Sequence, residues 1–230
     1  MRLVTGSKLL LNLVLMFLLP IPAHAIPAIT CHCFTDRSYD AAHPTAADAY
    51  FLATAQNSFF AIVFNIDKKS IVMKKQQGTS SDDLWVAYWV AAKAGKSPDS
   101  LFQDKTKSVS WKNVVVSLKL PPKILGARFS NALNANVPTD RLSEAVVDEL
   151  FLKDQLLGEW DLADVRKAGA NNQELIIATV IATKTKQSAR QLYLEVKAGT
   201  KTWGSLLSWA KIDTKNMQQE VANILKLHPQ

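Results

Sequence analysis

The sequence predicts an all-α protein made of two tandem copies of a compact unit of four to five helices, preceded by a signal peptide. Three observations support this prediction: an export signal at the N-terminus, a self-similarity that recurs after about 91 residues, and helix-start residues at matching places in both copies. The predicted parts are a signal peptide at 1–25, a cysteine-containing segment at 26–47, a first helical copy at 48–133 and a second at 139–228.

The N-terminus has the three parts of an export signal in the expected order. Arg2 and Lys8 supply the positive region, residues 9–19 supply an apolar run, and Ala23-His24-Ala25 supplies a small-x-small cleavage site. The run has only 11 residues, whereas a membrane-spanning helix needs about 20, so cleavage is favoured over a permanent anchor. Lipoprotein processing at Cys31 is a weaker alternative. We therefore expect a periplasmic mature chain without a transmembrane helix.

Charge is distributed unevenly along the chain. The formal net charge is +7, or +5 without Arg2 and Lys8. Residues 48–138 hold twelve Lys or Arg against six acids, whereas residues 140–164 hold eight acids against two bases. These segments can attract each other within the fold, which is the commoner outcome. Alternatively, the basic part is a surface for an anionic lipid, an anionic polymer or an acidic envelope protein.

The internal repeat has a continuous register. Residues 78–84 match residues 169–175, and the same spacing continues without gaps to Leu101 and Leu192. After one inserted residue, Trp111 matches Trp203. Identities are sparse, but capping, small and apolar positions coincide, which is typical of a duplicated unit.

The repeat also decides between helix and strand. Residues 175–181 are rich in β-branched side chains and resemble a buried strand, but the matching residues 84–93 continue into alanines and favour a helix. Residues 114–118 look strand-like, whereas the matching residues 203–209 have helical spacing. Because both copies should share one fold, we predict helices at all four places.

Further patterns place helix starts and the core. Ser97 before Pro98 predicts a capped helix start, and Thr45, Asp161, Ser188 and Asp213 are further predicted caps. The helices at 84–94 and 175–183 are apolar nearly all round and are expected to be central. The residues 120–138, with three prolines, are a plausible domain boundary. Aromatic residues assigned to cores are Trp85, Tyr88, Trp89, Trp111, Trp203 and Trp209.

The succession of helices in each copy is superficially like a DNA-binding helix-turn-helix. However, an exported protein meets no chromosome, and residues 203–210, at the place of a recognition helix, contain no Lys or Arg. We therefore expect no nucleic-acid binding.

Catalytic motifs are scarce. The mature chain has three His and two Cys, and it has no H-E-x-x-H, G-x-S-x-G, P-loop or G-x-G-x-x-G motif. The acidic pairs Asp82-Asp83 and Asp148-Glu149 are not assigned a catalytic role, and the first sits at a helix start, where acids favour the dipole.

One cluster near the mature N-terminus could carry chemistry. Cys31, His32 and Cys33, with His43 nearby, offer thiolate and imidazole ligands for zinc or copper. Competing outcomes in an oxidising compartment are a tight local disulfide or a disulfide between chains.

The residues 31–34, 36–40 and 49–58 resemble the opening of a set of uncharacterised exported proteins from anaerobic, metal-reducing Gram-negative bacteria. The resemblance implies a periplasmic location and a helical fold. It implies no activity, cofactor or catalytic residue.

Three hypotheses for function follow. The first is an exported interaction or scaffold protein that binds through exposed faces or the groove between the copies. The second is a periplasmic metal-binding or thiol-redox protein that uses Cys31, His32, Cys33 and His43. The third is an envelope hydrolase with a site in the cleft between the copies. An enzyme is the less expected outcome.

Overall fold

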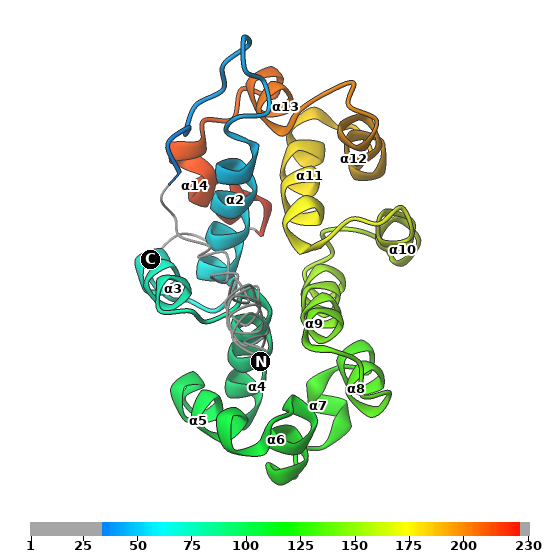
Figure 1. The fold of residues 1–230 in the computed structure, drawn as a ribbon. Coiled ribbons are helices and arrows are strands. Elements are labelled where there is room, and N and C mark those ends of the chain that lie inside the picture. The colour runs from blue at the N-terminus through cyan, green and yellow to red at the C-terminus, as the bar shows by residue number, and fades with distance from the viewer. Residues whose placement is uncertain (1–33, 226–230) are drawn as a thin grey trace, which may run out of the picture.

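The computed structural model describes residues 34–225, and this part of the chain is all-α, as the sequence predicts (Figure 1). It contains thirteen α-helices and one 3₁₀ turn, and no strand within the described residues. The helices of residues 48–134, called here the first half, are α2 (Asp48–Val63), α3 (Lys68–Gln76), α4 (Ser81–Ala94), α5 (Pro98–Ser108), α6 (Trp111–Ser117), α7 (Pro122–Leu125) and α8 (Ala127–Asn134). Those of residues 139–224, the second half, are α9 (Thr139–Lys153), α10 (Glu159–Lys167), α11 (Asn172–Thr185), α12 (Ala189–Lys197), α13 (Trp203–Trp209), η1 (Thr214–Asn216) and α14 (Met217–Ile224).

The two halves present helices in the same order and of similar length. The helices α2, α3, α4 and α5 begin 91 residues before α9, α10, α11 and α12, respectively. Both regions with strand-like composition are helical: residues 175–181 lie in α11 and residues 114–117 lie in α6. The helix prediction is therefore confirmed at these two places.

The long first helix of each half packs against the other half. Helix α2 lies against α11, α13 and α14, whereas α9 lies against α4 and α8. This exchange produces two lobes, shown in Figure 1. The first lobe consists of α4–α9 and the second lobe of α11–α14 together with α2. Helices α3 and α10 connect the lobes.

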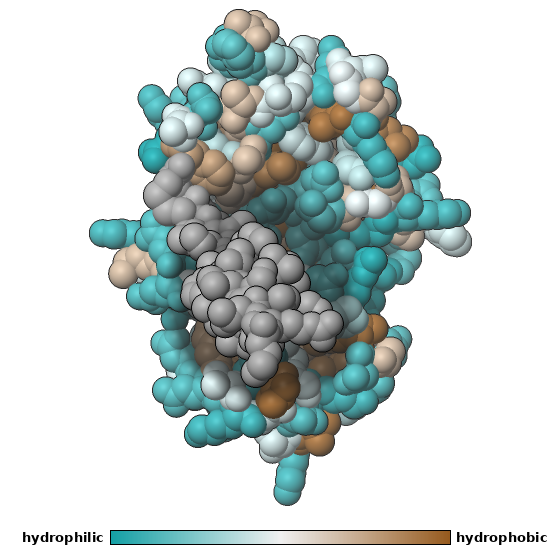
Figure 2. Space-filling view, in the orientation of Figure 1, coloured by the Kyte–Doolittle hydropathy of each residue, from teal (hydrophilic) through white to brown (hydrophobic). Residues whose placement is uncertain are grey.

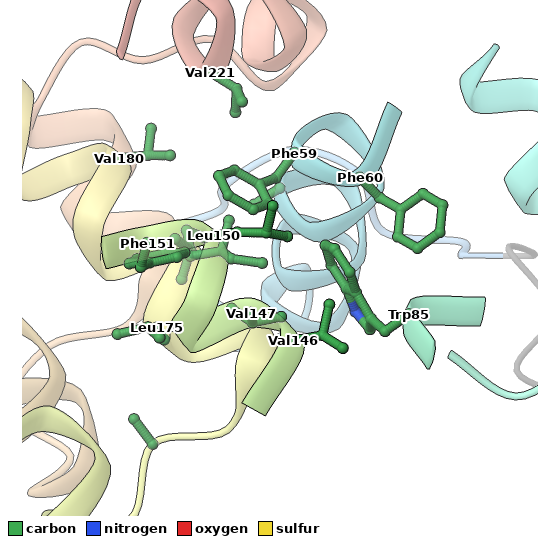
Figure 3. Close-up of a cluster of buried hydrophobic side chains, with 14 of the residues drawn as sticks. Phe59, Phe60, Trp85, Val146, Val147, Leu150, Phe151, Leu175, Val180 and Val221 are labelled. Atoms are coloured by element: carbon green, nitrogen blue, oxygen red, sulfur yellow. The ribbon is translucent and has the colours of Figure 1, made fainter. Parts of the chain in front are cut away.

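The hydrophobic core runs between the lobes (Figure 3). Phe59 of α2 meets Phe151 of α9 with ring centroids 5.4 Å apart, and Phe60 meets Trp85 of α4 at 4.5 Å. The side chains of α4 and α11 are buried on most sides, which confirms that they are the central helices. Burying such aromatic side chains supplies much of the stability of a small helical protein.

Two groups of sequence predictions need correction or extension. Trp209 is not a core residue, because 53% of it is exposed at the end of the short helix α13. The residues 120–138 contain α7 and α8, whose Leu125, Phe129 and Leu133 are buried. The proline-containing segment therefore contributes to the core.

The predicted caps are partly confirmed. Ser97 accepts a hydrogen bond from the Ser100 N–H, and Asp213 accepts one from the Lys215 N–H. Ser188 is the N-cap residue of α12, as predicted, although its side chain makes no capping hydrogen bond. Thr45 and Asp161 are wrong as caps, because Thr45 lies before the N-cap of α2 and Asp161 lies inside α10. Helix α2 instead begins at Asp48, whose carboxylate accepts hydrogen bonds from the Trp203 and Gly204 N–H groups. The first residue of α2 thus caps α13, a contact that local sequence does not reveal.

Left-handed backbone positions recur at similar places in the two halves. Gly95 and Lys186 occupy them after α4 and α11, and Lys119 and Lys211 occupy them after α6 and α13. The turn after α12 has Gly199, whereas the turn after α5 has Val109.

Among the described helices, none is long and apolar enough to cross a membrane.

Candidate binding pocket

Buried polar side chains gather where the two lobes meet. Thr54, Gln56, Asn57 and Ser58 follow one another closely in the middle of α2, and each is at most 7% exposed. They are joined by further buried polar residues from α3, α9 and α11: Lys75, Ser143, Asp148 and Asn172. Burial of polar groups costs free energy unless they are hydrogen-bonded, so we expect these side chains to be joined by hydrogen bonds.

A chain of hydrogen bonds connects the lobes through these residues. The Ser143 hydroxyl donates to the Asp82 carboxylate at 2.5 Å and accepts from the Asn172 amide at 3.1 Å. Arg166 then donates to Asn172 Oδ1 at 2.6 Å and to Asp148 Oδ1 at 2.9 Å. The network joins α4, α9, α10 and α11 and fixes the relative position of their ends.

Two cations with little solvent exposure, Lys75 and Arg166, occupy corresponding places in the halves. In the second half, Arg166 faces the carboxylate of Asp148. In the first half, Lys75 donates to the neutral amide of Asn57 at 2.7 Å. Burial lowers the pKa of Lys75 to about 8, and the charge of Asp82 opposes this shift in part. Burial raises the pKa of Asp148, whereas the charge of Arg166 acts in the opposite direction.

A polar pocket opens beside this network, and we call it the central pocket. It has a volume of about 280 Å³ and lies where the first turns of α4, α9 and α11 approach the middle of α2. Figure 2 shows a hydrophilic hollow near the centre of the molecule's visible face. The lining residues are all polar or charged: Gln56, Ser81, Asp82, Asp140, Ser143, Glu144, Asn171, Asn172 and Gln173.

The central pocket is rich in hydrogen-bond acceptors. Burial raises the pKa of Asp82, the bond from Ser143 lowers it, and the negative charges of Asp140, Asp83 and Glu144 raise it further. Of these acids, Glu144 is paired with Arg141 at 2.6 Å. Asp83 is engaged by the indole N–H of Trp111 at 2.7 Å. A positively charged group in the central pocket would therefore relieve repulsion between carboxylates.

Gln56 supplies a donor to the same space. Its residue exposure is 3%, it lines the central pocket, and its Oε1 accepts a hydrogen bond from Gln173 at 2.9 Å. Within residues 34–225, the structure shows no hydrogen bond donated by Gln56 Nε2, and this group is not fully buried. An amide donor of a pocket-lining residue that makes no bond within the described chain is suited to an oxygen atom of a ligand.

Of the four predicted metal ligands, His43 alone lies in the part of the chain that the structure describes. Cys31, His32 and Cys33 lie outside the described residues. His43 lies in an exposed loop, with its Nδ1 3.1 Å from Oδ2 of Asp40. Within residues 34–225, His, Cys, Asp and Glu form no group that could hold a metal ion. The prediction of a zinc or copper site therefore stays untested.

Sequence reasoning did not find the central pocket. The pair Asp82-Asp83 was recognised as a helix start, and both residues do lie in the first turn of α4. One signal was available: the polar residues 54 and 56–58 interrupt an otherwise apolar helix. Such an interruption in a buried helix indicates a polar tertiary environment.

Comparisons of the chain with protein-family models, with curated proteins and with solved structures gave no match.

Proposed function

We propose that this protein is an exported binding protein that holds a small, hydrophilic, positively charged molecule in the central pocket. The supporting observation is the combination of an all-polar lining, three carboxylates and the amide donor of Gln56. Carboxylates favour an ammonium group, and the Gln56 donor favours a hydroxyl or carbonyl oxygen on the same ligand. This places binding in the groove between the halves.

The size of the central pocket limits the ligand. At the volume share of about 30 Å³ for a water molecule, it has room for on the order of ten non-hydrogen atoms. Small amines with hydroxyl groups fit this limit. A folded protein partner would engage the pocket only through a single side chain, so a scaffold role requires the exposed faces instead.

The proposal also includes export and duplication. The export signal in the first 25 residues supports a periplasmic location. The matched helix order and the recurring left-handed positions support two copies of one ancestral unit. In a duplicated protein, a site at the junction can become asymmetric as the copies diverge.

Binding can be tested with four soluble probes: glucosamine, spermidine, N-acetylglucosamine and glucose. We expect glucosamine, which has an amine and hydroxyl groups, to raise the unfolding temperature and to give measurable heats of binding. Spermidine, which has amines but no oxygen, should do so less, and the two neutral sugars should not. Asp82→Asn should remove the effect of the amines. Asp164→Asn, which removes an exposed carboxylate on α10, is the matched control and should retain it. Equal stabilisation by all four probes would contradict the proposal.

The same pocket favours one second candidate, a hydrolase. The raised pKa of Asp82 is a property of general acids, and its neighbours include further carboxylates. Turnover of chromogenic glycosides that Asp82→Asn abolishes and Asp164→Asn preserves would identify an enzyme. Binding without turnover would leave the first proposal standing.

A further inference from the structure

One end of the first lobe is basic. The chain has no Asp or Glu from Lys105 to Thr139, and helices α5, α6 and α7 of this stretch lie together at the lower end of the molecule in Figure 1. The lysines here are Lys105, Lys107, Lys112, Lys119 and Lys123. We call residues 105–124 the basic end.

The positive charge of the basic end is not neutralised within the described chain. None of the five lysines forms an ion pair within residues 34–225. The nearby Asp99 of α5 pairs with Lys74 instead. Lys105 and Lys112 donate to backbone carbonyls. Uncompensated lysines of this kind create a local positive potential that attracts anionic surfaces.

Exposed aliphatic side chains lie among these lysines. Val109 is 82% exposed, Val116 is 64% exposed and Ile124 is 40% exposed. Val116 lies on the exposed side of α6, away from its buried residues Trp111 and Val114, and Val109 lies in the turn that joins α5 to α6. Figure 2 shows hydrophobic residues interrupting the hydrophilic surface at the lower end of the molecule.

Val109 is also in an unfavourable backbone conformation. Its φ is +64°, in the left-handed region, where a β-branched residue is rare. The corresponding turn after α12 uses Gly199. Neither packing nor backbone geometry explains a valine at this exposed position, and strained residues of this kind often mark a functional contact.

We infer that the basic end docks on the surface of a membrane that contains anionic lipid. The lysines face the lipid phosphates, and Val109, Val116 and Ile124 enter the headgroup region. An anionic polysaccharide would attract the lysines but would leave the three aliphatic side chains in water. The lipid surface therefore accounts for both observations, and it is independent of the central pocket.

Vesicle sedimentation tests this inference. The protein lacking the predicted signal peptide is used, because the apolar run of the signal would itself bind lipid. Binding is expected to vesicles of phosphatidylcholine mixed with phosphatidylglycerol, and not to phosphatidylcholine alone. High salt should weaken it. Absence of binding to the mixed vesicles would overturn the inference.

Charge variants locate the surface. Lys107→Glu combined with Lys119→Glu should lower vesicle affinity by at least about fivefold for each lysine. The matched control is Lys201→Glu combined with Lys211→Glu, which makes the same change at the corresponding end of the second lobe and should retain affinity. An equal loss in both double variants would mean that net charge, and not the basic end, controls binding.

The valine gives the most specific test. Val109→Gly should raise the unfolding temperature, because glycine adopts a positive φ without steric strain. The same variant should weaken binding to the mixed vesicles severalfold, because it removes an aliphatic side chain from the surface. A structural role alone would not combine higher stability with weaker binding. Two results together would overturn lipid insertion: Val109→Gly binds the mixed vesicles as tightly as the parent protein does, and the anionic polysaccharide dextran sulfate displaces the parent protein completely from them. The basic end would then recognise negative charge alone.

Discussion

The two halves of the molecule hold a cation at corresponding positions, largely out of solvent, and give it different partners. In the second half, Arg166 meets a carboxylate and also donates to the Ala170 carbonyl and to Asn172. In the first half, the Lys75 ammonium donates a hydrogen bond to the amide of Asn57 within the described chain, and Asp82 acts on it through its charge. The difference suggests that one site secures the fold, whereas the other stays sensitive to protonation beside the central pocket.

The largest expected effect separates these two cations. Arg166→Met leaves Asp148 with the more distant Arg128 at 3.8 Å and removes the donors to Asn172 and Ala170. We expect a loss of about 3 kcal/mol in the free energy of unfolding, because a buried carboxylate loses its partner. Lys75→Met should leave stability unchanged or raise it, because the variant removes the cost of the buried charge together with the hydrogen bond to Asn57. Urea denaturation at neutral pH measures both, and equal losses would show that Lys75 is as well compensated as Arg166.

The second effect is a pH dependence that belongs to the first half. The pKa of Lys75 is about 8 in the folded chain against an ordinary value of 10.5, so the unfolded chain binds this proton more tightly. The free energy of unfolding should therefore rise between these two pH values, by roughly 3 kcal/mol. Below about pH 8 the full cost of the buried charge is present.

The pH effect is read as a difference between the parent protein and Lys75→Met, because other groups titrate in both. Asn57→Asp should give Lys75 a carboxylate partner, as Arg166 has in the second half. It places a carboxylate at the position that Lys75 already contacts, which raises the pKa of Lys75 and flattens the pH dependence. An unchanged slope in Asn57→Asp would mean that another group is responsible.

A third effect compares the first turns of α6 and α13. A Cβ at Gly204 would come within 2.7 Å of Tyr39 Cδ2 and 2.9 Å of Phe51 Cε2. Gly204→Ala should therefore cost about 1–3 kcal/mol through overpacking. The corresponding residue of the first half, Lys112, is only partly buried, and Lys112→Ala should cost less than about 0.5 kcal/mol. Thermal unfolding followed by circular dichroism distinguishes the two.

The smallest effect concerns the left-handed turns after α5 and α12. Val109→Gly should stabilise the protein by about 1 kcal/mol, and Gly199→Val should destabilise it by about the same amount. A Cβ at Gly199 meets no atom within 4 Å, so the change there reports backbone strain and not a clash. Denaturation curves recorded under the same conditions give the change in the free energy of unfolding for each variant. Changes of the same sign would contradict the explanation by backbone strain.

Sequence reasoning succeeded where two weak local signals could be combined. Neither residues 84–93 nor residues 175–181 decide their own structure, but the register between them favoured helices, and α4 and α11 are helices. It failed where a contact joins distant segments. Thr45 looked like a cap, yet Asp48 caps a helix more than 150 positions later in the chain.

The central pocket was out of reach for the same reason. Gln56, Asp82, Ser143 and Asn172 belong to four different helices, and no spacing in the sequence connects them. The burial of Lys75 was equally hidden, because a lysine on a short polar helix is normally solvated. Trp209 shows the converse error, since a tryptophan at helical spacing was assigned to the core and is half exposed.

The exchange of long helices between the halves has a consequence for the order of folding. The first lobe, α4–α9, is a continuous stretch and has all its helices once residue 153 has been made. Helix α2 is made first, yet its partners α11, α13 and α14 come last. The second lobe therefore closes only when the chain is nearly complete, and this late, long-range step should limit the folding rate. A chain built in this way stays unfinished until its C-terminal helices have been made, which would suit the export across a membrane that we propose.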